Sequence, residues 1–437
     1  MGIENFMTNL IDTFPSVINN KKPKDIHTLC IDLNGILHKI CYRCNDKVKF
    51  KKSLISTLFR LIKKTKPSFI AIFIDGQAML AKANTQIKRR DKYLYSKSSG
   101  ISPLNLTPGT PFMDFIDETI NEFLSNLDIG TFFSSSKVNN EGEIKMFEWL
   151  LNNNINERIC IVGNDSDIIV LALVNRPLLN LYFYNDDNYM SLFKIVENLS
   201  NLISIKFSYN WHPVRMDFVL LSLFQGNDYL CRISNFKKLF ESYKVISKKG
   251  FLLKKDGSFN LKNIRKLLNL IDCSSDIEEY DSETVEEYFK SLQWNFNLYQ
   301  GKINNRYLPI SSINLSSIIK HFPKELSPFT KNVNWLKPEA YTLLLMPITG
   351  KDFLPNNLKQ YMEEDSIIKD LFPEPCIECI QWKQKLKELI EPEDKSSPEF
   401  AKYKNQLRKT NAAYSNHLKS FHSAKELPIE RLESIQY

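Results

Sequence analysis

The sequence lacks the features that would place the protein in a membrane or outside the cell. It has no uninterrupted apolar run of the roughly 20 residues that a bilayer-spanning helix needs. Its amino terminus has no basic region followed by a long apolar run, and Phe6 stands where myristoylation after Gly2 needs Ser or Thr. The eight cysteines form no dense disulfide pattern in a chain of 437 residues. We therefore expect a cytoplasmic monomer with no membrane partner.

What is present is enough to build a sizeable folded core. The length allows two or three domains, and an apolar content of 43% is ample for a packed interior. The formal net charge is only +8, but basic residues are concentrated between positions 82 and 97. Because concentrated positive charge attracts polyanions, this segment is a candidate contact for a nucleic acid.

An apolar, β-branched run over residues 159–163 leads into two carboxylates, Asp165 and Asp167. The run predicts a buried parallel strand. In an extended segment residues i and i+2 point the same way, so the two acids would face one point beyond the strand's carboxyl end. Such carboxylate-rich, histidine-poor sites favour Mg²⁺ over Zn²⁺. The alternative is an ordinary Asn/Asp/Ser turn.

Two earlier segments repeat the pattern of an apolar run that ends in an acid. The runs that begin at His27 and Ser68 end at Asp32 and Asp75, with helical stretches between them. Three such strands separated by helices predict a parallel sheet that gathers its acids along one edge. We therefore predict a doubly wound α/β fold with a mostly parallel sheet, flanking helices and a smaller, mainly helical second region.

Three basic residues and one glutamine follow Asp75 on a segment, residues 78–97, that we expect to be helical. Their spacing of i, i+4, i+7 and i+8 puts them on one helix face, where they could hold a phosphate. They are Lys82, Gln86, Arg89 and Arg90. A solvated basic face is the alternative interpretation.

Two Cys-x-x-Cys pairs occur, Cys41/Cys44 and Cys376/Cys379. Together they could supply four thiolates to a zinc ion. Their separation in the sequence lies far outside zinc-finger spacing, so we interpret them as incidental thiols.

These motifs, in their order, resemble those of the XRN family of 5'-3' exoribonucleases. The resemblance covers residues 1–232, with weaker similarity beyond. The segments that carry it are Asp32–His38, Asp75–Arg90, Thr107–Met113, Glu141–Lys145, Asp165–Asp167 and Gly226–Asp228. It implies a PIN/FEN-like nuclease core in a short family member. Its regions would be a catalytic domain over 1–240, a reduced second conserved region over 241–382 and a charged helical tail over 383–437.

The resemblance also assigns roles to single residues. Seven acids would hold two Mg²⁺ ions, for which Mn²⁺ can substitute, and these acids are Asp32, Asp75, Glu141, Glu143, Asp165, Asp167 and Asp228. The basic face would bind the substrate's 5'-phosphate, and His38 would stack on its terminal base. The implied partner is single-stranded RNA with a 5'-monophosphate end, degraded to nucleoside monophosphates after decapping, with a decapping or accessory protein as a further partner.

The sequence departs from the family pattern in two places. The Gly226–Asp228 motif continues into Tyr229-Leu230-Cys231-Arg232 instead of Phe-Leu-Pro and a histidine. The aromatic-rich segment expected after Gly301 is replaced by residues 302–307, so the partner that would sandwich the base against His38 is not identifiable. Processivity therefore stays open.

Two other functions remain as alternatives. One is a flap-type DNA nuclease, a class that carries a glycine-rich helix-hairpin-helix after its last acid; residues 229–249 contain no glycine. The other is an RNA-binding scaffold that kept the fold without catalysis, since basic grooves and stacking suffice for binding. Retention of all seven acids argues against the scaffold.

Overall fold

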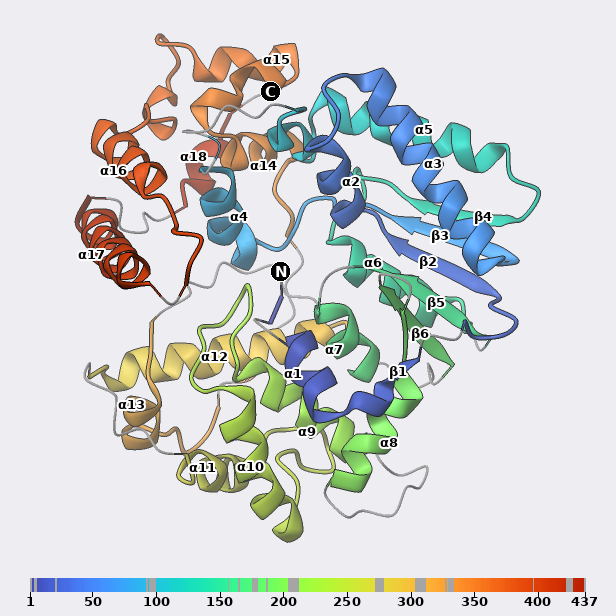
Figure 1. Cartoon of the computed structure of the whole chain (residues 1–437), viewed down its shortest axis with the longest axis vertical. Coiled ribbons are helices and arrows are strands. Elements are labelled where there is room, and N and C mark those ends of the chain that lie inside the picture. The colour runs from blue at the N-terminus through green and yellow to red at the C-terminus, as the bar shows by residue number, and fades with distance from the viewer. Residues whose placement is uncertain are drawn as a thin grey trace. The chain divides into compact units, whose positions relative to one another are not determined.

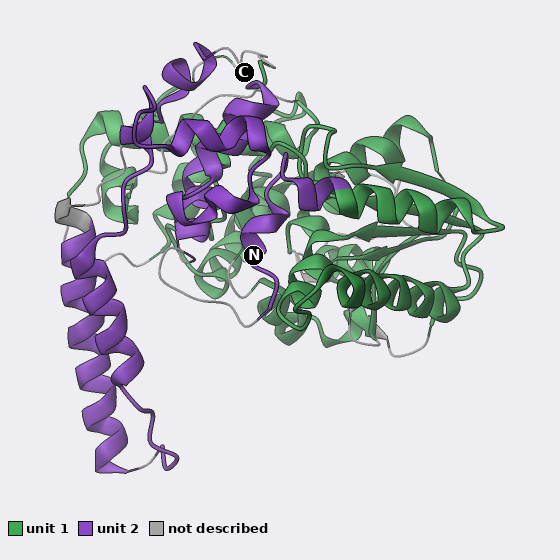
Figure 2. Cartoon of the chain, turned by 90° about the horizontal axis from the view of Figure 1, so that it is seen from above, with its two compact units in different colours: residues 1–82, 115–335 green, residues 83–114, 336–437 purple. Residues whose placement is uncertain are grey.

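A computed structural model describes residues 2–3, 6–19, 22–91, 93, 100–155, 157–163, 166–174, 180–185, 188–202, 212–271, 279–302, 312–326, 328, 334–395, 397–421 and 427–435. The chain divides into two compact units, which Figure 2 distinguishes by colour. Unit 1 comprises residues 1–82 and 115–335, and unit 2 comprises residues 83–114 and 336–437. The region boundaries predicted at residues 240 and 382 follow from the family resemblance and not from compactness, so they stay predictions.

Unit 1 is organised around one seven-stranded sheet with helices on both of its sides (Figures 1 and 2). The strand order is β1-β7-β6-β5-β2-β3-β4, and the run from β6 to β4 is parallel throughout. Strand β7 pairs antiparallel with both of its neighbours, β6 and β1. The strands are β1 (Ile18–Asn19), β2 (Thr28–Asp32), β3 (Phe69–Phe73), β4 (Gly130–Ser134), β5 (Ile159–Val162), β6 (Leu181–Asn185) and β7 (Asn188–Ser191). The predicted α/β fold with a mostly parallel sheet is confirmed.

The central position of β2 explains where the acids gather. All five residues of β2 are buried, as an apolar strand covered on both faces should be. The strand lies between β3 and β5, and Asp32 is level with Phe73 of β3. Because all three strands run parallel, the residues that follow them emerge at the same edge of the sheet.

The helices of unit 1 cover the sheet and build the rest of the core. They are α1 (Phe6–Thr13), α2 (Asn34–Cys41), α3 (Lys47–Thr65), α6 (Gly142–Asn152), α7 (Asp167–Val174), α8 (Leu192–Leu202), α9 (His212–Leu223), α10 (Phe236–Ile246), α11 (Leu261–Leu268), α12 (Ser282–Tyr299) and α13 (Leu315–Lys320). Every residue of α7 is buried, which fits its almost wholly apolar sequence. Helix α5 (Pro111–Ser125) begins in unit 2 and ends in unit 1.

Unit 2 is helical in its described residues. Its helices are α4 (Ala83–Arg90), α14 (Pro338–Leu345), α15 (Asn356–Lys359), α16 (Ile377–Glu388), α17 (Pro398–Phe421) and α18 (Ile429–Glu433). The turn around Gly109, which has a positive φ of 89°, packs against α14. Thr342 on α14 donates a hydrogen bond of 2.8 Å to the carbonyl oxygen of Pro108. The Thr107–Met113 motif therefore has a packing role within this unit.

Two local predictions need correction. The basic helix predicted over residues 78–97 is shorter: a 3₁₀ turn at Leu80–Lys82 precedes α4, and residues 94–99 lie outside the described part. Asp167 is not in an extended segment, because β5 ends at Val162 and Asp167 is the first residue of α7. The i, i+2 argument for that pair therefore fails at Asp167. No helix among the described residues is long and apolar enough to cross a membrane.

Candidate active site

Three carboxylates from separate elements meet at the carboxyl edge of the sheet. Asp32 ends β2, Asp75 follows β3 by two residues, and Glu143 lies in the first turn of α6. One carboxylate oxygen from each lies within 4.8 Å of the others, and the three could hold a metal ion. We call Asp32, Asp75 and Glu143 the acid cluster. Asp32 and Asp75 come from the predicted acid-ended strands, and Glu143 comes from a helix start.

Gly142 permits this close approach. Its backbone N–H donates a hydrogen bond of 2.7 Å to Asp75 Oδ1. A Cβ atom at this position would stand 2.9 Å from Asp32 Oδ1 and 3.4 Å from Asp75 Oδ1. The glycine between the two glutamates of the motif therefore lets the start of α6 lie directly against both aspartates, where its free N–H groups favour negative charge.

The charges in the acid cluster suit a hard divalent cation. Burial, and then the charges of Glu141, Asp32 and Asp75, raise the pKa of the Glu143 carboxyl well above its ordinary value. Lys82 acts in the opposite direction, and the remaining rise is expected where several carboxylates lie close together. Oxygen donors are the ligands that Mg²⁺, Mn²⁺ and Ca²⁺ take in proteins, so these residues fit such an ion.

A second polar cluster surrounds the buried amine of Lys82. This amine forms an ion pair with Glu141 Oε1, and its Nζ lies 3.0 Å from Asp228 Oδ2. Burial by itself would lower the pKa of Lys82, but the neighbouring Glu141, Tyr229 and Asp228 hold it well above its ordinary value. Lys82 is therefore a buried cation stabilised by acids in this structure.

Tyr229 completes this Lys82 cluster. Its hydroxyl donates a hydrogen bond of 2.6 Å to Glu141 Oε2, and the amine of Lys82 lies 5.6 Å from the centre of its ring. The ring also packs against Trp294. In the sequence, Tyr229 is only a departure from the family pattern, with no predicted role.

Six of the seven predicted acids lie in the described residues, and they fall into three groups. Asp32, Asp75 and Glu143 form the acid cluster, and Glu141 and Asp228 pair with Lys82. Asp167 is buried at the start of α7. Asp165 lies outside the described residues.

The remaining predicted substrate residues have varied surroundings. His38 is exposed on α2, and Arg89 is half-buried on α4. Gln86 is buried and accepts a hydrogen bond of 2.9 Å at Oε1 from the hydroxyl of Tyr341. Arg90 donates from Nε to Thr107 Oγ1 at 2.9 Å. Tyr341 and Thr107 therefore hold the side chains of Gln86 and Arg90 on α4, and the sequence did not reveal these contacts.

Lys145 is a further residue without a predicted role. It is buried, and its amine donates hydrogen bonds of 2.9 Å to the carbonyl oxygen of Ser135 and 3.1 Å to that of Val138. Burial lowers its pKa to about 8, although Asp75 and Asp117 act in the opposite direction. In the sequence, only its position at the end of the Glu141–Lys145 motif pointed to a role for Lys145. Lys145 fixes the loop between β4 and α6, and so the start of α6.

The sequence matches a known protein family. The family profile described as "XRN 5'-3' exonuclease N-terminus" matches residues 1–101 and 92–180. Human 5'-3' exoribonuclease 1 is 24% identical over 383 residues, which cover 70% of this chain and 22% of the human protein. The Saccharomyces cerevisiae 5'-3' exoribonuclease 1 is 26% identical over 375 residues, covering 67% of this chain and 24% of the yeast protein. The chain thus spans about a quarter or less of these relatives.

Solved structures of nucleases show a weaker likeness. The catalytic core of Rad2 in complex with a DNA substrate has a TM-score of 0.39 at 15% identity, covering 83% of this chain and 98% of Rad2. The T5 D15 protein crystallised with metal ions has a TM-score of 0.35 at 12% identity, covering 62% of this chain and 86% of D15. At these scores the likeness carries no argument about activity.

Proposed function

We propose that this chain, whose sequence matches the XRN 5'-3' exonuclease family model over residues 1–101 and 92–180, hydrolyses single-stranded RNA from a 5'-monophosphate end and releases nucleoside monophosphates. The observation that carries the proposal is the acid cluster at the carboxyl edge of the parallel sheet. Carboxylates that lie this close repel one another, and a bound divalent cation would relieve that repulsion.

The proposed cofactor is Mg²⁺, with Mn²⁺ as a substitute. Asp32, Asp75 and Glu143 would hold it, and Glu141, Asp165, Asp167 and Asp228 complete the proposed set for two ions. Bound divalent ions supply an activated water and stabilise the leaving oxygen of a phosphodiester. Gly142 and Lys145 act as positioning residues, because they set where the start of α6 places Glu143.

The proposed substrate residues are those of the basic face. Lys82, Gln86, Arg89 and Arg90 would bind the terminal phosphate, and His38 would stack on the first base. Arginine suits this task because its guanidinium group binds phosphate through paired hydrogen bonds. The contact between Arg90 and Thr107 supports the proposal by holding that guanidinium group on one side of α4.

The direct test compares matched single-stranded RNAs with 5'-monophosphate, 5'-hydroxyl or 5'-triphosphate ends, and single-stranded DNA, in the presence of Mg²⁺. We expect mononucleotides from the monophosphate RNA and little product from the others. Asp75→Asn and Asp167→Ala should abolish cleavage, with circular dichroism verifying that both variants are folded. Equal cleavage of DNA would favour the flap-type alternative, and binding without cleavage by the wild-type chain would favour the scaffold.

A second test addresses the end preference alone. The double variant Arg89→Ala/Arg90→Ala should lose most of its preference for 5'-monophosphate over 5'-hydroxyl ends and keep residual cleavage of both. Lys88→Ala is the matched control, because Lys88 is an exposed cation on the same helix. Equal loss on every end, or the same effect from Lys88→Ala, would contradict the assignment. A cytoplasmic role after decapping, with an accessory protein partner, belongs to the same proposal.

A further inference from the structure

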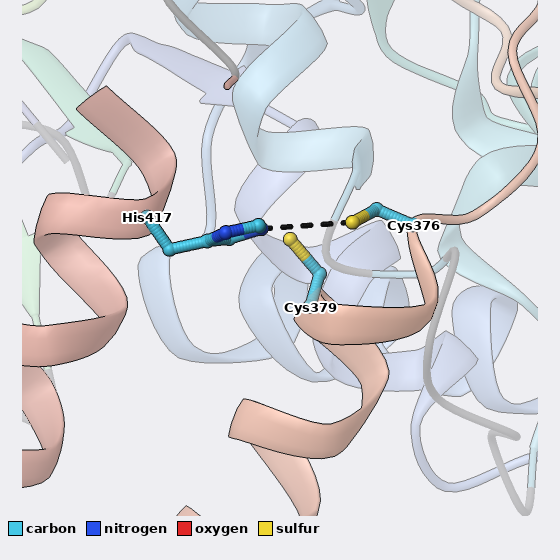
Figure 3. A group of neighbouring side chains, drawn as sticks. All are labelled: Cys376, Cys379 and His417. Atoms are coloured by element: carbon cyan, nitrogen blue, oxygen red, sulfur yellow. Dashed lines mark hydrogen bonds between the residues drawn. The ribbon is translucent and has the colours of Figure 1, made fainter. Parts of the chain in front are cut away.

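Unit 2 contains a cluster of metal-binding side chains that the proposed nuclease function does not use. Cys376 immediately precedes α16, Cys379 lies in the first turn of that helix, and His417 lies on α17 (Figure 3). One ligand atom from each lies within 4.8 Å of the others. Figure 3 shows both sulfur atoms and the imidazole ring of His417 pointing toward one another.

The distance between Cys376 and His417 fits two ligands of one zinc ion. Cys376 Sγ lies 3.6 Å from His417 Nε2. Zinc takes thiolate sulfur at about 2.3 Å and imidazole nitrogen at about 2.05 Å, so two such ligands at a tetrahedral angle are about 3.5 Å apart. The pair therefore already has the separation that a shared ion would impose.

The imidazole is oriented as a metal ligand usually is. His417 Nδ1 lies 2.9 Å from Glu378 Oε2. When Nδ1 carries a proton and donates it to this carboxylate, Nε2 presents its lone pair to the two sulfur atoms. Metal-bound histidines commonly have such a carboxylate on their other nitrogen, which fixes the ring. Glu378 comes from the same Cys-x-x-Cys segment, so one helix start supplies two sulfur ligands and the orienting acid.

Few side chains of these two helices are fully buried. Of the side chains that the structure describes in α16 and α17, Cys379 and His417 are the only buried ones, at 2% and 9% exposure. Ile377 is 71% exposed and Ile380 is 43% exposed. Helices with so few fully buried side chains gain little stability from packing, and small structures of this kind commonly depend on a disulfide or a metal ion.

We propose that Cys376, Cys379 and His417 bind a zinc ion that fastens α16 to α17. Two thiolates and an imidazole select zinc over Mg²⁺, which prefers oxygen. The fourth ligand is a water molecule or another donor. From the sequence, the only zinc site to consider was one that combined both cysteine pairs, and the cysteines were therefore interpreted as incidental thiols. The structure instead supplies a histidine, distant in the sequence, to the second pair. This site is independent of the acid cluster.

The first experiment measures the metal content of the full chain after purification and dialysis against a metal-chelating resin. We expect about one zinc ion per chain. The zinc should be lost from Cys376→Ser, Cys379→Ser and His417→Ala. The double variant Cys41→Ser/Cys44→Ser is the matched control and should keep its zinc, as should Asp75→Asn in the acid cluster. A wild-type chain without zinc that also fails to take up added Zn²⁺ would overturn the proposal. Loss of zinc only from the control pair would overturn it too.

A second measurement uses the wild-type chain alone, so that it does not depend on the folding of variants. Co²⁺ added to the metal-free chain should give the visible absorption of a tetrahedral ion and a sulfur charge-transfer band. Alkylation followed by mass spectrometry should find Cys376 and Cys379 protected by Zn²⁺ and not by Mg²⁺. Ready formation of a disulfide between them, without metal protection, would assign the pair to redox chemistry instead. RNA cleavage by zinc-free protein would leave the nuclease proposal intact.

Discussion

The hydroxyl of Tyr229 donates a hydrogen bond of 2.6 Å to Glu141 Oε2, and the amine of Lys82 holds the other oxygen of the same carboxylate. Glu141 is 4% exposed, so both contacts lie in the interior. Burial raises the pKa of Glu141, whereas Lys82 acts in the opposite direction. These two contacts fix Glu141 beside the acid cluster, two residues before Glu143.

Tyr229→Phe should therefore weaken the fold near the site. It removes the hydroxyl and leaves a buried carboxylate oxygen without this donor, while the ring keeps its contacts with Lys82 and Trp294. We expect a loss of about 1–3 kcal/mol in the free energy of unfolding. Urea denaturation of the two proteins measures it. Equal midpoints and slopes would show that the hydroxyl contributes nothing.

Gly142→Ala should impair metal binding more than stability. Alanine is favoured over glycine in a helix by up to about 1 kcal/mol. Its Cβ would nevertheless stand 2.9 Å from Asp32 Oδ1 and push that carboxylate aside. We expect weaker Mn²⁺ binding by isothermal titration calorimetry, with an unfolding midpoint close to that of the wild type. Asn152→Ala, at the exposed end of the same helix, is the control for helix propensity. Unchanged Mn²⁺ affinity in Gly142→Ala would contradict the assignment of the acid cluster.

Tyr341→Phe tests whether the orientation of Gln86 matters for the substrate end. The variant keeps the volume of a fully buried side chain and removes the hydroxyl that donates to Gln86 Oε1. A freed amide would no longer be held in one orientation. We expect the ratio of kcat/KM between 5'-monophosphate and 5'-hydroxyl RNA to fall several-fold, with a loss of about 1 kcal/mol in stability. If Tyr341→Phe and Lys88→Ala show the same ratio of kcat/KM between the two RNA ends, Tyr341 contributes only to packing.

Asp217 makes stability depend on pH away from the site. Its carboxylate accepts hydrogen bonds from the backbone N–H groups of Leu252 and Leu253 and from the hydroxyl of Tyr243. Burial raises its pKa to about 7, against the opposing effect of these hydrogen bonds. The folded chain therefore keeps a proton that the unfolded chain releases near pH 4, so this contribution to stability is lost as the pH rises from about 4 to about 7.

The corresponding variant is Asp217→Asn, which cannot titrate and loses part of the hydrogen bonding. We expect it to be less stable than the wild type by about 1–3 kcal/mol. The difference in the free energy of unfolding should be larger near pH 5 than near pH 8, because only the wild type loses stability over that interval. A difference that is constant with pH would show that Asp217 does not titrate in this range.

Much of the sheet and part of the site were predictable from the sequence. The apolar runs that end at Asp32 and Asp75 identified two parallel strands, because strand burial and helix alternation are local patterns. Parallel strands in one sheet necessarily bring the acids after them to one edge, so the meeting of Asp32 with Asp75 followed. The helical position of Asp167 did not follow, because Asn/Asp/Ser segments suit a turn or helix start as well as a strand end.

Only the tertiary structure decided which polar residues share an interior. The basic periodicity around Lys82 did not reveal that its amine is buried between Glu141 and Asp228, because these contacts join separate elements. The pairing of Cys376 and Cys379 with His417 was likewise invisible, since their sequence separation matches no zinc-finger spacing. Local sequence determined the strands, helices and acids of this protein. Long-range packing determined which charge or sulfur atom each of those residues meets, because such contacts depend on how the elements pack and not on their periodicity.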